Sequence, residues 1–191
     1  MDTTDEIAAP APISAAERRR RMLRPALIGL VALIFNIAVY LLPIDYSAFG
    51  NYAYLGVFLI TAIANATVIV PVPYIPLVAR VAAQTDNVGL VILAGALGSA
   101  LGESVAFFVG RSGRGAVETT RFYMWVQRQL RHPWRAFVVL FLLAAPPNPA
   151  FDVAGLTAGA LGLPYWLFIS AVFLGRIVRI GLIALAGLKL G

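Results

Sequence analysis

Long apolar runs, separated by short polar or proline-rich breaks, make up most of this chain. The runs at about 25–42, 54–70, 88–110 and 165–188 approach or exceed the roughly 20 residues that an α-helix needs to cross a bilayer. The pattern predicts an all-α integral membrane protein, with residues 25–191 as a single membrane domain. Residues 1–24 mix Ala, Pro and charged residues without periodicity, and we expect a disordered basic tail there.

Two proline clusters interrupt the apolar pattern. Proline removes a backbone donor and stops a helix, and non-helical backbone at membrane depth is tolerated only where it is buried in protein or lines a wet cavity. Each cluster is followed by a short apolar limb and then by a long apolar run. We therefore expect two re-entrant hairpins, each followed by a transmembrane helix. The predicted break residues are Pro71, Pro73, Pro76, Pro146, Pro147 and Pro149.

The two hairpin-plus-span units, at about 54–110 and 137–188, are predicted to form an inverted repeat. Leu-Gly-Glu ending at Glu103 in the first unit is matched by Leu-Gly-Arg ending at Arg176 in the second, 73 residues later. Opposed repeats with broken helices in corresponding places are typical of secondary transporters. The alternative is that Pro-X-Pro steps recur by chance in a chain with 12 prolines.

The net charge of +6 is concentrated in two arginine-rich segments, 18–24 and 111–135. The positive-inside rule places both in the cytoplasm, so the first apolar helix runs outward from a cytoplasmic N-terminus. That first run could also be a signal peptide, but it is long for a signal core and no small-residue cleavage site follows it. We expect a retained transmembrane helix.

The connector at about 111–136 is predicted to hold an amphipathic helix along the inner leaflet. Phe122, Val126 and Leu130 fall on one helical face and are expected to lie in the lipid interface. Arginines on another face are expected to hold anionic lipid head groups rather than nucleic acid. These arginines are Arg121, Arg128, Arg131 and Arg135.

Few polar side chains occur inside the apolar runs, and each is a functional candidate because an unpaired ion in hydrocarbon costs at least a few kcal/mol. Glu103 and Arg176 both lie near mid-span and could meet at the bilayer midplane, with Arg179 one helical turn on. Such a pair would either belong to a polar path or only fix helix register. The predicted path residues are Glu103, Asp152, Arg176, Arg179, Arg80, Asn65 and Asn148.

The remaining path candidates also have structural interpretations. Asp152 is expected near the second hairpin tip as the cap of the returning limb, where it could also contact a lipid amine. Arg80 is expected to extend to the outer interface or to an acidic partner. Asn65 and Asn148 can bond backbone groups freed by the prolines.

The composition disfavours several kinds of chemistry. The chain has no cysteine and one histidine, so we expect no metal site, no cofactor and no enzymatic activity. Gly95, Gly98 and Gly102 repeat at three- and four-residue spacing, which predicts close helix packing in the membrane rather than nucleotide binding.

Two segments resemble a known family. Gly-Glu-Ser-Val-Ala-Phe-Phe-Val-Gly-Arg-Ser-Gly at 102–113 is similar to the glycine-rich helix of the DedA family, also called the VTT or SNARE-associated membrane domain. Asn-Pro-Ala-Phe-Asp-Val-Ala-Gly-Leu-Thr-Ala-Gly at 148–159 resembles its second hairpin. The resemblance covers about 50–188. It implies two opposed hairpins and movement of lipids between leaflets, by scramblases in some branches and by proton- or sodium-linked carriers of undecaprenyl phosphate or phosphatidylethanolamine in others.

The chain departs from the coupled members of that family. They place acids around the first hairpin prolines, where this chain has Asn65 and Pro-Tyr-Ile-Pro at 73–76, and they carry arginines at the second hairpin, where 142–147 has none. We therefore expect an uncoupled scramblase or flippase for phospholipid or polyprenyl-phosphate lipid in a prokaryotic plasma membrane. A proton- or sodium-coupled transporter of a small solute, and a non-transporting scaffold, are the alternatives. Membrane lipids are the expected partners, and self-association stays open.

Overall fold

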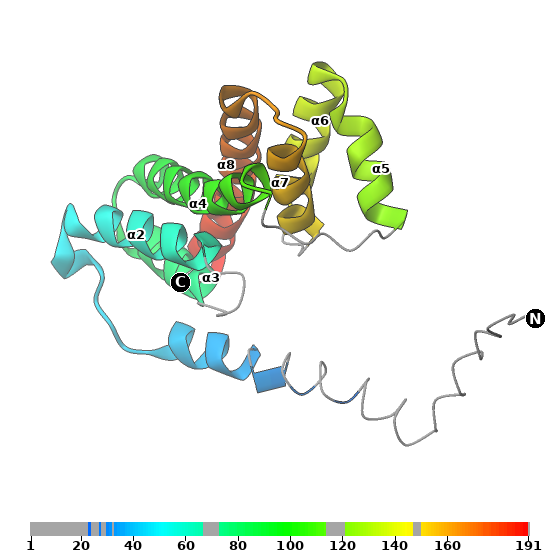
Figure 1. The fold of residues 1–191 in the computed structure, drawn as a ribbon. Coiled ribbons are helices and arrows are strands. Elements are labelled where there is room, and N and C mark those ends of the chain that lie inside the picture. The colour runs from blue at the N-terminus through cyan, green and yellow to red at the C-terminus, as the bar shows by residue number, and fades with distance from the viewer. Residues whose placement is uncertain are drawn as a thin grey trace, which may run out of the picture.

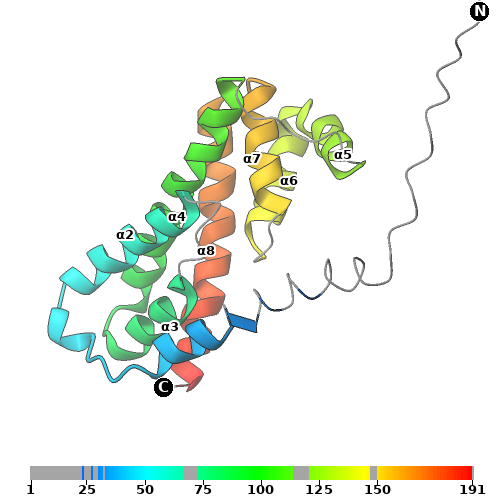
Figure 2. The same ribbon diagram turned by 60° about the horizontal axis from the view of Figure 1, so that its bottom comes forward.

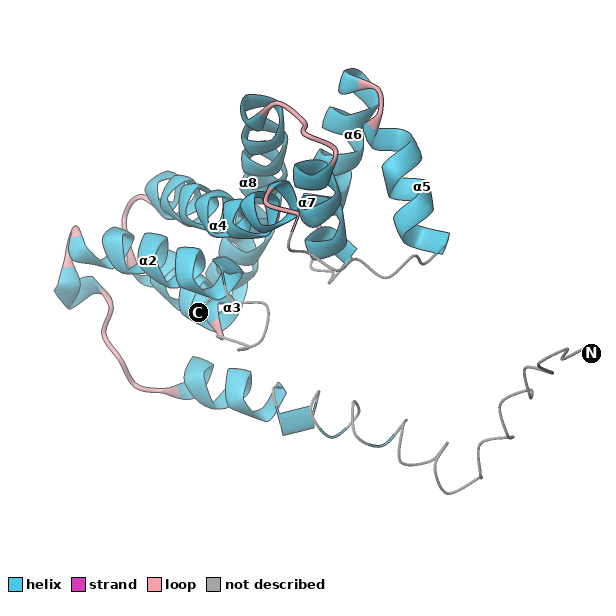
Figure 3. Cartoon of the chain, in the orientation of Figure 1, coloured by secondary structure: helices cyan, strands magenta, loops and turns pink. Residues whose placement is uncertain are grey.

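The computed structural model describes residues 23, 27, 30–31, 33–66, 73–113, 121–146 and 150–190. Every regular element in these ranges is a helix, and they contain no strand (Figure 3). The all-α prediction is confirmed for them. Nearly all of the predicted disordered tail lies outside the described residues, as do residues 25, 26, 28, 29 and 32 of the predicted first transmembrane helix, in which 33–41 is helical.

Two helices, α4 and α8, are apolar and long enough to cross a membrane, with 24 and 26 residues. At a rise of 1.5 Å per residue, both exceed a hydrocarbon core of about 30 Å. The helices α2, α3, α6 and α7 are shorter, and the second limbs α3 and α7 have only 11 residues each. The elements are η1 (Ser47–Phe49), α2 (Tyr52–Ala66), α3 (Tyr74–Gln84), α4 (Val88–Arg111), α5 (Arg121–Leu130), α6 (Pro133–Ala144), α7 (Ala150–Ala160) and α8 (Tyr165–Leu190).

The long helices α4 and α8 form the centre of the molecule, and the shorter helices pack around them (Figures 1 and 2). The first limb of each predicted hairpin packs on the long helix of its own half, α2 on α4 and α6 on α8. The second limb crosses to the other half, so that α3 packs on α8 and α7 packs on α4. The two halves are therefore interlocked.

Glycine allows α4 to lie close against α2. A Cβ atom on Gly98 would stand 2.1 Å from the carbonyl oxygen of Phe58, and one on Gly102 would stand 2.3 Å from that of Ala62. No side chain larger than hydrogen fits at such a distance. The packing role predicted for these glycines is confirmed.

Buried apolar side chains form two clusters, one toward each end of the α4–α8 pair. Phe107, Phe151 and Phe168 belong to the cluster where α4 ends and α8 begins. Val91 and Ile180 belong to the other cluster, which includes residues of α2 and α3. The charged residues of the candidate site lie between these clusters along the two long helices.

The connector contains the predicted amphipathic helix, α5, but two details of that prediction are wrong. The helix α5 ends at Leu130, and Pro133 begins α6, because proline suits a first helical turn and cannot continue the preceding helix. Arg131 therefore lies in the turn between the two helices and Arg135 lies on α6. Val126 and Leu130 are 0% and 2% exposed in the first apolar cluster, so this face of α5 packs on protein and not in the lipid interface.

Candidate functional site

A buried ion pair joins the two long helices. The Arg176 Nη2 atom on α8 donates a hydrogen bond to Glu103 Oε1 on α4. The side chains are only 2% and 4% exposed. The hypothesis that Glu103 and Arg176 meet is confirmed.

Helix backbones pack closely next to both residues of the pair. Glu103 follows Gly102, which lies against α2. Arg176 follows Gly175, where a Cβ atom would stand 2.7 Å from the carbonyl oxygen of Phe141 on α6. The guanidinium of Arg176 also stands 5.1 Å from the ring centroid of Phe151, a cation–π contact from α7.

The ion pair does not use all of its hydrogen-bonding capacity. Glu103 Oε2 and the Nε and Nη1 atoms of Arg176 are buried and have no partner among the described residues. The hydroxyl of Ser99, one turn before Glu103, is also buried without a partner there. A buried polar group without a partner is unfavourable by about 1–3 kcal/mol, more if charged. The described residues thus leave part of the hydrogen-bonding capacity of the pair unused.

Arg179 lies one turn beyond Arg176 and contacts a different neighbour. Its guanidinium stands 5.5 Å from the ring centroid of Tyr74, the first residue of α3. Its Nε atom is buried and has no hydrogen-bond partner in the described ranges. Arg179 thus extends the polar site from the α4–α8 contact toward the first hairpin.

Arg179 also lines a mostly apolar cavity of about 640 Å³. Its walls come from α3, from the end of α6 and from the second half of α8. The predicted break residue Pro146 is exposed at this cavity, next to Ala145. Residues from both predicted hairpins therefore meet around one guanidinium.

Asp152 belongs to the electrostatic surroundings of the pair, but not as a helix cap. The helix α7 begins at Ala150, so Asp152 is its third residue, inside the first turn. A carboxylate there still interacts favourably with the helix dipole. It is half-buried and within electrostatic range of Arg176 and Arg179, without an ion pair to either.

Two other predicted path residues lie apart from the pair. Arg80 on α3 points to the N-terminal segment, where its Nη2 atom donates to the carbonyl oxygen of Leu42 at 3.5 Å and its guanidinium stands 5.7 Å from the Tyr40 ring centroid. The Asn65 side chain donates to the Thr61 carbonyl oxygen of its own helix at 2.7 Å. Arg80 therefore anchors a neighbouring segment, and Asn65 bonds local backbone.

The remaining break residues are only partly described. Pro73 directly precedes α3, and the buried Pro76 lies in its first turn, where no intrahelical hydrogen bond is lost. The other predicted positions, Pro71, Pro147, Asn148 and Pro149, lie outside the described residues.

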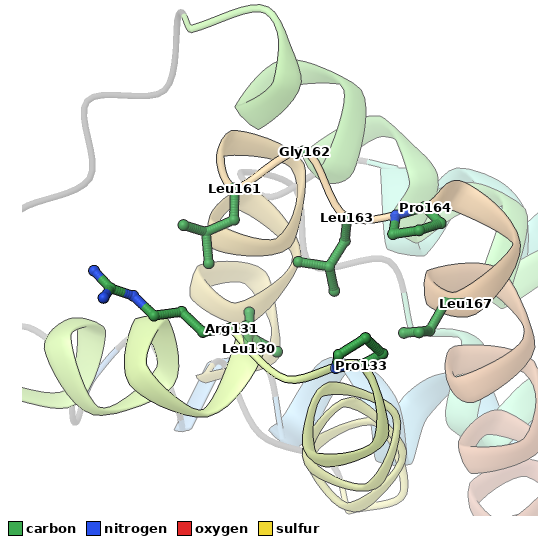
Figure 4. Close-up of a pocket in the computed structure, with 8 residues that line it drawn as sticks. All are labelled: Leu130, Arg131, Pro133, Leu161, Gly162, Leu163, Pro164 and Leu167. Carbon is green, nitrogen blue, oxygen red and sulfur yellow. The ribbon is translucent and has the colours of Figure 1, made fainter.

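The arginines predicted to hold lipid head groups lie on the outside of the molecule. Arg128, Arg131 and Arg135 are exposed, and for Arg121 only the backbone is described. Arg131 stands at the edge of a cavity of about 300 Å³ between the α5–α6 turn and the α7–α8 loop (Figure 4). Leucines and prolines form most of its wall, and the guanidinium of Arg131 points away from both prolines in that view.

A third cavity, of about 570 Å³, lies along α4. Ser104 and Tyr165 share a hydrogen bond of 2.9 Å there, between α4 and the start of α8. Like Tyr74 and Phe151, these residues were not predicted as site residues, since an isolated serine or aromatic residue in an apolar run gives no signal. Among the described residues, no group of three or more His, Asp or Glu side chains could hold a metal ion.

A model of the VTT domain matches residues 72–189, which includes α3 to α8 and both residues of the buried pair. The chain belongs to the VTT domain family. This confirms the resemblance inferred from 102–113 and 148–159. VTT relatives include vacuole membrane proteins, which agrees with the presence of two helices long and apolar enough to cross a membrane among the described residues.

The VTT relatives are distant and longer. The vacuole membrane protein KMS1 of Arabidopsis thaliana is 29% identical over 104 residues, 43% of this chain and 24% of the relative. Human vacuole membrane protein 1 is 28% identical over 103 residues, 43% of this chain and 25% of the relative. The chain thus spans about a quarter of the length of these relatives. No solved structure matches it significantly.

Proposed function

We propose that this VTT protein moves lipids between the leaflets of a prokaryotic plasma membrane as an uncoupled scramblase or flippase, without enzymatic chemistry. The observation that supports this most directly is the buried Glu103–Arg176 pair, placed between two membrane-length helices and beside a third charged side chain, Arg179. Charged side chains at such depth usually belong to a substrate or ion pathway.

The proposal includes two re-entrant hairpins in an inverted repeat. The limbs α3 and α7 are about 16 Å long at 1.5 Å per residue, too short to cross a core of about 30 Å. Their exchanged packing, α3 on α8 and α7 on α4, is what a two-fold relation between the halves would produce. Breaks at membrane depth are then tolerated because they lie against protein or a wet cavity.

In the proposed mechanism a lipid head group crosses along the polar seam between the halves while its acyl chains stay in the bilayer. Glu103, Arg176 and Arg179 supply charges, and unsatisfied donors and acceptors, that replace part of the water lost by the head group. Asp152 adds a carboxylate near the start of α7. The lower desolvation cost speeds exchange in both directions.

We propose uncoupled movement because the first hairpin lacks the acids of coupled family members. Asn65 bonds its own helix, and the limb α3 contains no carboxylate. Exposed arginines on the connector, including Arg128 and Arg131, are proposed to hold anionic lipids at the cytoplasmic face. By the positive-inside rule, the arginine-rich segments support a cytoplasmic N-terminus.

The test is a leaflet-exchange assay with fluorescent phospholipid in proteoliposomes, with and without a proton or sodium gradient. We expect exchange that needs no gradient and that falls about tenfold or more in Glu103→Gln and Arg176→Gln, corresponding to about 1.4 kcal/mol of added barrier. Exchange that appears only with a gradient would instead favour coupled transport.

A charge-exchanged variant separates a transport role from a structural one. Glu103→Arg combined with Arg176→Glu keeps a buried ion pair but reverses its direction. If the pair acts in transport, this variant regains thermal stability while exchange stays low. Recovery of both properties would show that the pair only fixes the register of α4 against α8, and the proposed role in transport would be wrong.

A further inference from the structure

We propose that the cavity beside Arg179 is a binding site for one anionic membrane lipid, with the head group on the guanidinium and one acyl chain along α8. The inference rests on the proposed lipid-moving function, because it names the class of lipid that this function would handle. It also assigns the lipid to one side of the molecule.

Charge is the first support. Among the described residues, Arg179 is the one charged residue in the wall of this cavity. Within the described chain it has no ion pair, and its buried Nε atom has no hydrogen-bond partner. The nearby Glu103 carboxylate is already bonded to Arg176. An arginine at membrane depth is stabilised by an anion, and a phosphate accepts hydrogen bonds from a guanidinium with good geometry.

Shape is the second support. Beyond Arg179 the wall is apolar, and it includes Ala79, Leu182, Ala186 and Leu190. Along α8, Leu190 follows Arg179 by 11 positions, which corresponds to about 16 Å at a rise of 1.5 Å per residue. A small inorganic anion would leave this surface and most of the 640 Å³ unfilled. A lipid fills both parts, because its anionic head is joined to a long apolar chain.

The cavity along α4 provides a matched comparison. Its residues Leu101, Val105 and Val109 precede Val178, Leu182 and Ala186 of the Arg179 cavity by 77 residues each. At the same spacing Gly102 precedes Arg179, and no charged residue of the described ranges lines the α4 cavity. The α4 cavity is therefore expected to hold lipid chains without selecting an anionic head group.

The test measures lipid binding directly. The purified full chain in detergent is titrated with phosphatidylglycerol or with phosphatidylcholine, and bound lipid is counted by native mass spectrometry. We expect wild type to prefer phosphatidylglycerol and Arg179→Gln to lose about tenfold of that preference, with Arg179→Lys retaining most of it. Ala186→Trp, which fills the apolar end, should weaken binding of both lipids. Val109→Trp, the matched change on α4, should leave the preference unchanged.

The outcomes separate this site from the proposed function. An undiminished preference in Arg179→Gln, or equal effects of Ala186→Trp and Val109→Trp, would overturn the site. Displacement of the lipid by millimolar inorganic phosphate would show a simple anion site and would also overturn it. Selective binding by wild type that never leads to leaflet exchange would support the site while contradicting the proposed function. If Arg179→Gln does not fold, Arg179→Lys and the two tryptophan variants decide the question.

Discussion

The two halves of this VTT protein use the same packing but carry different polar groups. In the first half, a Cβ atom on Gly110 of α4 would stand 2.0 Å from the carbonyl oxygen of Leu156 on α7. In the second half, one on Gly187 of α8 would stand 2.1 Å from that of Ala79 on α3. Gly187 follows Gly110 by 77 residues, and Leu156 follows Ala79 by 77. Backbone contact between a limb and the opposite long helix is thus built twice in one way.

The polar residues do not follow this equivalence. Counted by 77, the charged Arg179 corresponds to Gly102, and Arg80 corresponds to the buried Thr157. Counted by 77, Arg176 corresponds to Ser99 and Glu103 corresponds to Ile180. The ion pair therefore joins positions that are not equivalent, although the 73-residue spacing in the sequence had suggested that they were. The comparison indicates that glycine contacts define the scaffold, while single charges make one side of it different.

The largest expected effect comes from breaking the ion pair that joins the halves. Glu103→Leu leaves the buried guanidinium of Arg176 without its partner, and we expect the free energy of unfolding to fall by about 3–5 kcal/mol. The double variant Glu103→Leu with Arg176→Met removes both charges, and its free energy of unfolding should fall much less. Thermal or denaturant unfolding in detergent measures both. Asp152→Asn, at a half-buried residue without an ion pair, serves as the control, and an equal loss there would contradict the assignment.

The equivalence of the glycine contacts predicts matched losses. Gly110→Ala and Gly187→Ala each place a methyl group against a backbone carbonyl that cannot yield, and each should lower stability by about 1–3 kcal/mol. Unfolding of the purified variants is the measurement. Gly56→Ala is the control, because a Cβ atom there meets nothing within 4 Å. Sensitivity at only one of the two glycines would break the comparison between the halves.

The hydrogen bond in the α4 cavity should have a smaller effect. Tyr165→Phe removes the 2.9 Å hydrogen bond with Ser104, and we expect the free energy of unfolding to fall by about 1 kcal/mol. A double-mutant cycle with Ser104→Ala isolates the interaction of the two hydroxyls. The largely exposed Tyr52 provides the control variant Tyr52→Phe. A coupling energy near zero would mean that this hydrogen bond does not hold α4 against α8.

The smallest effect is expected at Arg80, where α3 contacts the N-terminal segment. Replacing it by glutamine removes the cation–π contact with Tyr40, and should loosen that segment by about 0.5–1 kcal/mol. Faster hydrogen exchange confined to residues 33–42 would show this. Thr157→Val, at the equivalent position on α7, should leave exchange in that segment unchanged. If residues 33–42 exchange at the same rate in Arg80→Gln as in wild type, this difference between the halves is contradicted.

Several elements could be predicted from the local pattern of the chain. Apolar length defined α4 and α8, since a run of more than 20 apolar residues has few other stable structures. The prolines marked where the short limbs begin, because proline cannot continue a helix. Charge in an apolar run also singled out Glu103 and Arg176, because such burial needs a partner.

The contacts between these elements could not be predicted in the same way, because they depend on how distant segments pack. Helical periodicity showed that α5 is amphipathic but could not tell a lipid surface from a protein surface, and Val126 and Leu130 proved to face protein. Nor did sequence spacing show that Arg179 would lie on Tyr74 in a cavity while Arg176, one turn away, pairs with α4. Neighbouring turns of one helix contact different partners. Glycine spacing predicted close packing of the helices, but it could not tell which backbone lies against each glycine.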